Sequence, residues 1–306
     1  MKFRVAICTI VLVVVLSELF ARLYLGLGDP PISIRDADVD YMFAPNQQCR
    51  RFGNKIQYNN LSMRCGFDVH ASDGQSRIYV VGDSVINGGV LTDQSDLATS
   101  MLQENLKSTS GNWQVCNVSA GSWGPGNYAA YFRKYHECVR STDVLVVEVN
   151  SHDLWEDDPS QKGGCDVGKD IALPDHKPWC ALWDGFHRYF LPLMRQFCGK
   201  AQINTKVDVP KWQNDAENER AKYNLSMLEE VFALPCSRKA LLIYRSRKEA
   251  EECVESVGER AFRECAEKNG IHIIMPILNA ETDYRDKIHP TVSGQKKIAD
   301  SIRGWL

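Results

Sequence analysis

The chain has 306 residues, a hydrophobic fraction of 44 % and a formal net charge of −3 at pH 7. This length allows one or two domains, and the composition is that of a globular protein with a sizeable core. Because acidic and basic residues nearly balance and no long basic block occurs, the sequence indicates no nucleic-acid partner.

The N-terminus predicts a membrane helix. Lys2 and Arg4 precede a run from Val5 to Leu16 that is rich in Val, Ile and Leu and contains no charged residue, and apolar residues prevail as far as Leu27. The stretch 5–27 is long enough to cross a hydrocarbon core of about 30 Å. We therefore expect residues 1–28 to be a signal anchor, with the rest of the chain extracytoplasmic, on the periplasmic or extracellular side, because basic residues precede the run. The alternative is a cleaved signal peptide and a secreted form.

The chain contains 11 cysteines, of which only Cys8 lies in the apolar run. Ten further cysteines are many for an enzyme in a reducing compartment, so we predict disulfides, although the sequence does not reveal their pairing. The alternative is a set of buried free thiols. No Cys-x-x-Cys pair occurs, which argues against zinc, and we expect neither a metal nor a cofactor.

After the anchor, residues 29–76 form a polar lead-in with one predicted edge strand at 55–58. From Arg77 onward, short apolar runs alternate with helical patterns. This alternation predicts an α/β fold in which helices cover both faces of a parallel sheet. The expected strands are 78–81, 113–118, 144–149, 240–244 and 271–277, and the expected helices are 93–107, 127–139, 248–268 and 293–305.

The alternation stops at about 155–210, which we interpret as an insertion in a domain spanning 77–306. The insertion carries three cysteines and a cluster of aromatic residues. One interpretation is a disulfide-stapled excursion with its own small core. The other is a lid or substrate-binding wall, because the insertion begins directly after Asn150 and Asp153. The cysteines are Cys165, Cys180 and Cys198, and the aromatic residues are Trp179, Trp183, Phe186, Tyr189, Phe190 and Phe197.

Four short segments follow predicted strands and supply different parts of a serine-nucleophile site. Ser84 comes after the first strand, Gly121 after the second, and Asn150 ends the third. Asp286 and His289 lie between the last strand and the last helix. Since ligands of open parallel sheets bind at the carboxyl ends of the strands, we expect these residues to converge.

Each residue type suits one chemical task. A serine hydroxyl becomes a nucleophile when a base removes its proton, and His289 is the candidate base. Asp286 lies three residues earlier and can accept the second ring N–H, which fixes the tautomer. The backbone N–H groups of Ser84 and Gly121 and the side-chain amide of Asn150 are candidate oxyanion donors.

Each segment alone also has a structural interpretation. The Gly82-Asp83-Ser84 sequence fits an ordinary helix cap, and Asn150 fits a strand-end turn. Gly121 fits a turn as well, and Gly124 competes with it for the oxyanion role. Only the ordered set favours catalysis.

The set resembles the SGNH, or GDSL-type, hydrolase superfamily. The matching stretches are Tyr79–Gly89, Asn117–Gly121, Val147–Asn150 and Asp286–Gly294. The resemblance covers 77–306 apart from the insertion. It implies a flavodoxin-like three-layer fold with about five parallel strands. It further implies ester or acyl chemistry without a metal, with Ser84, Asp286 and His289 catalytic and with Ser84, Gly121 and Asn150 in the oxyanion hole. The N-terminal anchor is similar to that of membrane-tethered bacterial members.

Two departures from the family pattern concern the second block, which lacks the usual spacing to its glycine, and the third block. The family usually has Gly-x-Asn-Asp there, whereas this chain has Glu148 in place of the glycine and its next acid at Asp153. The roles of both acids stay open at this stage, and so does the choice between Gly121 and Gly124.

The sequence thus predicts an extracytoplasmic serine esterase that acts through an acyl-enzyme. Its expected substrates are O-acyl groups, principally O-acetyl groups, of a carbohydrate or small ester. One alternative is an O-acyltransferase that uses the same residues to modify a surface polysaccharide. The other is a non-catalytic binding module tethered to the membrane.

Overall fold

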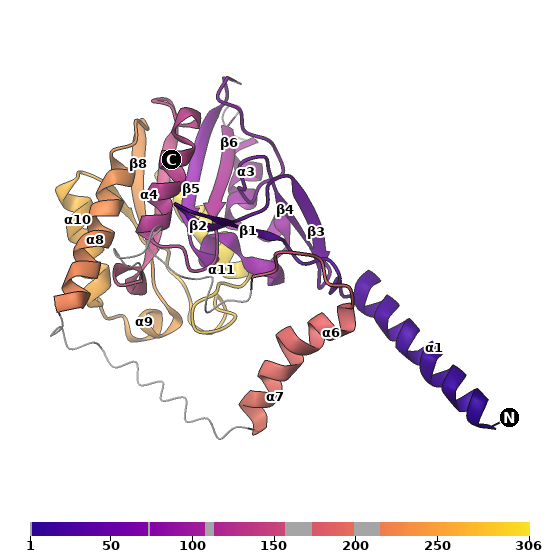
Figure 1. Ribbon diagram of the computed structural model, residues 1–306. Coiled ribbons are helices and arrows are strands. Elements are labelled where there is room, and N and C mark those ends of the chain that lie inside the picture. Colours follow the sequence, from indigo (N-terminus) through magenta and orange to yellow (C-terminus); the bar gives the residue numbers. More distant parts are fainter. Residues whose placement is uncertain (1, 73, 108–112, 157–172, 199–214) are drawn as a thin grey trace.

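A central parallel sheet organises the molecule. The structure, a computed structural model, describes residues 2–72, 74–107, 113–156, 173–198 and 215–306. The five strands lie in the order β6-β5-β7-β8-β9, and every pair is parallel (Figure 1). Counted along the chain this order is 2-1-3-4-5, as in flavodoxin-like sheets. The expected fold class is confirmed. The strands are β5 (Ser76–Gly82), β6 (Trp113–Ser119), β7 (Val144–Asn150), β8 (Arg238–Tyr244) and β9 (His272–Ile274).

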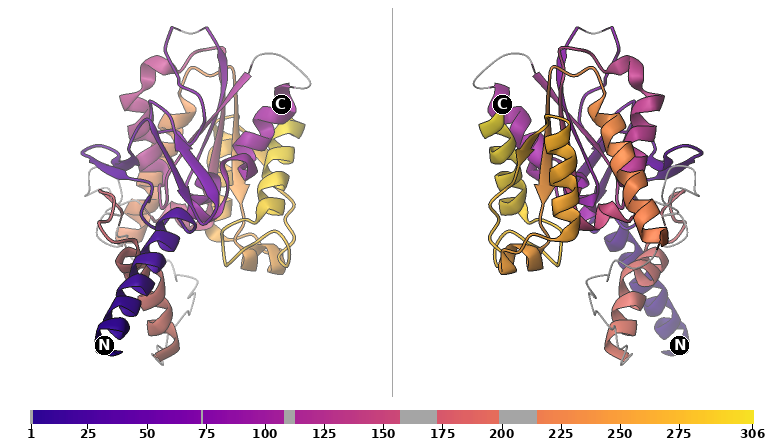
Figure 2. Two further views of the ribbon diagram at one scale, coloured as in Figure 1. Left: turned by 90° about the vertical axis from the view of Figure 1, so that its right-hand side faces the viewer. Right: turned by 90° about the vertical axis from the view of Figure 1, so that its left-hand side faces the viewer.

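The strand β7 explains why helices cover both faces. All seven of its residues are buried. Leu145 and Val147 point into one hydrophobic core, and Val144 and Val146 point into the other. This period of two gives three layers, because each apolar face must pack against helices (Figure 2). The first core is closed by α4 (Pro125–Lys134), α8 (Asp215–Phe232) and α10 (Val257–Lys268), and the second by α3 (Ala98–Lys107) and α11 (Val292–Trp305).

The lead-in is more regular than expected. Instead of one edge strand it forms two antiparallel hairpins, β1–β2 and β3–β4. Each strand has only four or five residues and mixes buried side chains with half-buried or exposed ones, so none forms a continuous apolar run in the sequence. The strands are β1 (Ser33–Asp36), β2 (Asp40–Phe43), β3 (Gln47–Arg51) and β4 (Asn54–Tyr58).

Several element boundaries also differ from the prediction. The helix expected over 248–268 is divided into α9 (Arg247–Glu252) and α10, because Cys253 adopts a positive φ of 52° and Ser256 caps the new helix. The helices expected over 93–107 and 127–139 are shorter, and each adjoins a 3-10 turn. The last strand ends at Ile274 rather than at 277. The turns are η1 (Gly89–Leu91), η2 (Gln94–Asp96), η3 (His136–Cys138) and η4 (Ser151–Leu154).

The N-terminal helix α1 (Lys2–Leu23) extends away from the domain (Figure 1). Within the described residues it is the one helix that is long and apolar enough to cross a membrane, and nearly all its side chains are exposed. Its 22 residues span about 33 Å, which matches a bilayer core. These properties are compatible with the expected anchor.

The described part of the insertion is helical rather than a small core. A continuous helical segment comprises α6 (Ala181–Gly185), the π-helical turn η5 (Phe186–Phe190) and α7 (Leu191–Cys198). Trp179 and Trp183 are 85 % and 58 % exposed. The interpretation as an excursion with its own small core is therefore wrong for these residues. Cys165 and the stretches 157–172 and 199–214 lie outside the described residues.

The disulfide prediction is wrong for the nine cysteines whose state the structure describes, all of which are free. Most of them are buried singly: Cys116 lies in β6, Cys265 in α10 and Cys49 in β3. They pack as small apolar side chains, and burial raises the pKa of the Cys49 and Cys265 thiols to about 11. The number of cysteines in a sequence can indicate an oxidising compartment, but it does not indicate which thiols lie close enough to pair. The pairing of Cys165 and Cys198 lies outside the description.

Candidate active site

The carboxyl edge of the sheet collects the candidate residues. Ser84 begins the short helix α2 (Ser84–Asn87) directly after β5, and Asn150 is the last residue of β7. The chain order reverses between these two neighbouring strands, which is where open α/β sheets bind their ligands. Gly121 follows β6, and the loop with Asp286 and His289 precedes α11.

Ser84, His289 and Asp286 form a hydrogen-bonded chain. The His289 Nε2 atom lies 3.0 Å from Ser84 Oγ, although the two residues are 205 positions apart. The other ring nitrogen, Nδ1, lies 2.8 Å from Asp286 Oδ2. With Nδ1 protonated, the ring donates to Asp286 and leaves Nε2 free to accept the serine proton. The distances are those that proton transfer needs.

The loop that carries His289 is held by the end of β8 and the start of α9. Tyr244 donates its hydroxyl to the Ile288 carbonyl at 2.6 Å, and Arg247 donates its N–H to the Lys287 carbonyl at 2.9 Å. Inside the loop, Asp286 Oδ1 accepts the N–H groups of Ile288 and His289 at 3.0 and 2.8 Å. This turn orients the carboxylate before it meets the imidazole.

The same contacts determine the charge of Asp286. Partial burial opposes ionisation, but the two backbone donors and the His289 ring outweigh it and lower the pKa of Asp286. The side chain is 49 % exposed, so water also solvates it. Asp286 is thus a carboxylate that can support a positively charged imidazole.

The turn that presents Ser84 is tightly packed. Asp83 caps α2 by accepting the Val85 N–H on Oδ1 at 2.7 Å. Gly82 has no room for a side chain, because a Cβ there would lie 2.5 Å from both Glu148 Oε2 and Ile86 Cγ1. Ser84 itself is half-buried, so its hydroxyl remains reachable.

Three buried carboxyl groups lie behind this turn: Asp83, Glu148 and Asp153. Burial raises the pKa of Asp83, and burial together with the Asp83 charge raises that of Glu148 well above its usual range. Burial and then the charge of Asp83 raise the pKa of Asp153 well above its usual range.

The shared proton of Asp83 and Glu148 belongs on Glu148. Asp83 accepts the Val85 N–H and, at 3.4 Å, the Asn150 amide, which favours its ionised form. Glu148 Oε1 is buried without a partner among the described residues. A neutral Glu148 can donate a hydrogen bond to the Asp83 carboxylate and avoids two buried negative charges side by side.

The two competing glycines differ in whether their N–H is available. The Gly124 N–H donates to Asn127 Oδ1 at 2.9 Å, where it caps α4. The Gly121 N–H has no acceptor within the described part of the chain, while its carbonyl accepts the Tyr41 hydroxyl at 2.7 Å. The geometry therefore favours Gly121 as an oxyanion donor.

The Asn150 amide is held rather than free. Its Nδ2 donates to Asp153 Oδ1 at 2.9 Å and to Asp83 Oδ2 at 3.4 Å. Asp153 also accepts the Asn150 N–H at 2.9 Å, so it fixes both ends of this residue. Displacement of the acid to position 153 thus still brings it to the site.

Sequence reasoning missed two residues that support the nucleophile turn. Arg64 is fully buried and donates to the carbonyls of Asn87, Gly89 and Thr92, the last at 2.7 Å. Gln295 in α11 donates to the Val85 carbonyl at 2.8 Å and accepts the Ala98 N–H. An arginine in a polar lead-in and a glutamine in a helix give no signal of such contacts. In the described residues, no three His, Cys, Asp or Glu side chains are placed to hold a metal ion.

Comparison with known proteins gives similarity at the level of structure only. No family model matches the chain, and no curated protein matches it. Among solved structures, the chain is similar to LAE5, an alpha/beta hydrolase enzyme from the metagenome of Lake Arreo. Identity is 14 %, the similarity covers 75 % of this chain and 94 % of that one, and the TM-score is 0.45.

Two further solved structures are similar to the chain. A member of the lipolytic G-D-S-L family from Veillonella parvula has 9 % identity over 75 % of this chain and 97 % of its own, with a TM-score of 0.42. The psychrotrophic esterase EstA from a Pseudoalteromonas species has 16 % identity over 76 % of this chain and 99 % of its own, with a TM-score of 0.41.

Proposed function

We propose that the chain is a serine ester hydrolase in which Ser84 is the nucleophile, His289 the base and Asp286 the acid that orients the base. The observation that carries the proposal is the unbroken contact from Ser84 Oγ through His289 to Asp286, at 3.0 and 2.8 Å. The sequence blocks that resemble SGNH hydrolases point to the same three residues.

The proposed reaction proceeds through an acyl-enzyme. His289 Nε2 takes the Ser84 proton while Oγ forms a bond to the ester carbonyl carbon. The tetrahedral intermediate then collapses, the C–O bond to the alcohol breaks, and His289 returns the proton to the departing alkoxide. Water repeats the sequence, with His289 as base, and releases the acid and free Ser84.

The negative carbonyl oxygen requires donors beside Ser84. We assign this task to the N–H groups of Ser84 and Gly121 and to the Asn150 amide. Ser84 is the first residue of α2, where N–H groups have no partner inside the helix. Of the two Asn150 contacts, that to Asp83 is the longer, so its hydrogen is the one that an oxyanion can recruit.

We propose that the substrates are O-acyl esters, principally O-acetyl esters, of a carbohydrate or small molecule. Residues 77–306 would form the catalytic domain. The hydroxyl and imidazole are both partly exposed, which suits an ester on a larger carrier. The apolar helix α1 would anchor this domain on the outer side of a membrane, since Lys2 and Arg4 precede it.

The first test measures ester cleavage by the full chain in detergent. We expect release of p-nitrophenol from p-nitrophenyl acetate, and we expect Ser84→Ala to lower kcat by at least about 10³. Ser95→Ala, at an exposed serine in η2, is the matched control and should leave the rate unchanged. Equal turnover by Ser84→Ala and wild type would exclude the mechanism.

A second test separates an enzyme from a binding module. A fluorophosphonate probe should label Ser84, forming a phosphorus–oxygen bond with loss of fluoride, and labelling should disappear in Ser84→Ala and fall strongly in His289→Ala. If the wild-type chain is folded but not labelled, the binding module becomes the better explanation. Transfer of acetyl to an added glycan instead of to water would identify an acyltransferase that uses the same residues.

A further inference from the structure

An unusual apolar stripe lies on the helical segment 181–198. The residues that form it recur at helical spacing, so they lie along one face, and each is between 39 % and 58 % exposed. Trp179, just before the segment, is 85 % exposed. The surfaces of soluble proteins rarely display so many large apolar side chains together. The stripe consists of Trp183, Phe186, Phe190, Leu193 and Met194.

The opposite face of this segment is fixed to the protein by buried polar contacts. Arg51, which is 1 % exposed, pairs with Asp184 at 3.1 Å and donates to the Tyr189 hydroxyl at 2.9 Å. Gly185 packs so closely on Leu27 that a Cβ would lie 2.6 Å from it. The stripe is therefore presented outward by a docked helix.

The start of the segment is also joined to α1. Glu18 accepts the N–H groups of Ala181 and Leu182 at 2.8 and 2.9 Å and thereby caps α6. Arg22 pairs with Glu18 at 2.6 Å and donates to the Trp179 carbonyl. The polar residues that interrupt the apolar run of α1 thus serve as the attachment point of the second helix.

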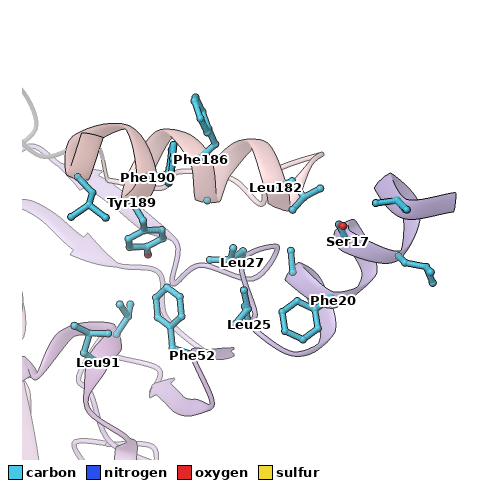
Figure 3. A pocket seen from close by; sticks show the side chains of 16 residues that line it. Ser17, Phe20, Leu25, Leu27, Phe52, Leu91, Leu182, Phe186, Tyr189 and Phe190 are labelled. Atoms are coloured by element: carbon cyan, nitrogen blue, oxygen red, sulfur yellow. The ribbon is translucent and has the colours of Figure 1, made fainter. Parts of the chain in front are cut away.

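Between the two helices lies an apolar groove of about 900 Å³ (Figure 3). Leu16 and Phe20 contribute from α1, and Phe186 and Phe190 from the docked segment. Val90 and Leu91, from the turn that follows α2, line it as well. Among the described residues that line the groove, Ser17 and Tyr189 alone carry a hydroxyl group, so water has few side-chain partners there.

The arrangement of the two helices suits a bilayer surface. They leave the same corner of the domain, diverge from each other, and both project beyond the side on which α9 and the carboxyl ends of the strands lie (Figures 1 and 2). If α1 crosses the bilayer, a helix that diverges from its outer end runs along the interface. Tryptophan and other aromatic residues are favoured at that depth.

We propose that the segment 181–198 is a second membrane contact, an interfacial helix whose apolar stripe is buried among the lipids beside α1. Lipid acyl chains would fill the groove between the helices. Two contacts orient the domain, and they place the carboxyl edge with Ser84 toward the bilayer. Esters displayed at the membrane surface would then be within reach. The membrane contact itself does not depend on the proposed hydrolysis.

The test uses tryptophan fluorescence of the full chain reconstituted in phosphatidylcholine vesicles that contain brominated lipids. Since α1 contains no tryptophan, the anchor contributes no quenching. We expect quenching in wild type, strongest with bromines near the glycerol end of the acyl chain, and we expect Trp179→Phe/Trp183→Phe to lose most of it. The control is Trp113→Phe/Trp305→Phe, at the start of β6 and the end of α11 on the opposite edge, which should keep the quenching.

Vesicle flotation measures anchoring by α1 separately from the contact of the segment 181–198. Both double variants keep α1 and should therefore float with the vesicles. Absence of quenching in floating wild type would overturn the proposal, as would equal quenching in Trp179→Phe/Trp183→Phe. If the stripe is covered by a second copy of the chain, lipids cannot reach the tryptophans, and wild type would likewise show no quenching.

Discussion

Glu148 packs its carboxyl group against Gly82, the residue that leads into the nucleophile turn. The strands β5 and β7 are neighbours in which Val81 pairs with Val147, so Gly82 and Glu148 follow at the same level. Glu148 Oε2 also accepts the Asp83 N–H at 3.4 Å. The contact occupies the space that a side chain at position 82 would need.

We predict that Gly82→Ala destabilises the protein. The added Cβ would lie 2.5 Å from Glu148 Oε2 and from Ile86 Cγ1, so the turn or strand β7 must shift. Overpacking of this kind costs about 1–3 kcal/mol, measured as a lower free energy of unfolding in urea. Gly304→Ala is the control, because a Cβ there meets nothing within 4 Å. Equal stability of the two variants would contradict the packing argument.

A second prediction concerns the neutral state of Glu148. Burial and the nearby Asp83 raise its pKa in the folded protein, so the stability it contributes is complete below its unfolded pKa and is lost as pH rises through the raised value. Glu148→Gln carries a neutral amide that can donate to Asp83 at every pH. The variant should therefore gain stability relative to wild type as pH rises, by at most about 1.4 kcal/mol per pH unit.

Chemical unfolding at several pH values measures this difference. Glu267→Gln, at an exposed position of α10, should follow the wild-type curve. A constant difference between Glu148→Gln and wild type across the pH range would show that Glu148 is not protonated in the folded state.

The sequence predicts the central sheet well because its strands are continuous apolar runs buried on both faces. For the same reason the sequence indicates which edge of the sheet holds the site. Ser84 directly follows an apolar run, and His289 lies in the loop that follows the last one. The hairpin strands and the helix break at Cys253 are harder to predict from the sequence. Their conformation depends on contacts with distant residues and on one positive φ, not on a periodic pattern.

The supporting residues of the site illustrate the same limit. A glutamate within the apolar strand β7 is visible in the sequence, but its contact with Gly82 depends on which strands are neighbours. Arg64 holds three carbonyls after α2 only because the lead-in folds back onto the sheet edge. Cysteine pairing fails as a prediction for a related reason, because the number of thiols does not determine their separation.

A third prediction tests the Asn150 amide. Removing one oxyanion donor lowers kcat by about 10²–10³, and we expect this loss in Asn150→Ala with little change in KM. The buried residue Asn224 is the matched control, because its amide binds the carbonyls of Leu154 and Arg220. Asn224→Ala should lower stability yet keep the kcat of the folded protein. Unchanged kcat in Asn150→Ala would assign the oxyanion to the backbone donors alone.

The last prediction concerns Asp286→Asn. The asparagine carbonyl can still accept the Ile288 and His289 N–H groups, so the loop should keep its shape. Its NH₂ group, however, cannot accept the proton of His289 Nδ1. The ring would then place its proton on Nε2, which can no longer accept the Ser84 proton, and kcat should fall by about 10²–10⁴.

The pH dependence of this contact has a definite sign. Because the pKa of Asp286 is lowered in the folded state, the stability from its hydrogen bonds is present above the unfolded pKa and is lost as pH falls through the folded value. Asp286→Asn should remove this acid-side loss, whereas Asp300→Asn, at an exposed position of α11, should retain it along with full activity. If both variants hydrolyse p-nitrophenyl acetate at the wild-type rate, Asp286 does not orient His289, and the base must act without a partner.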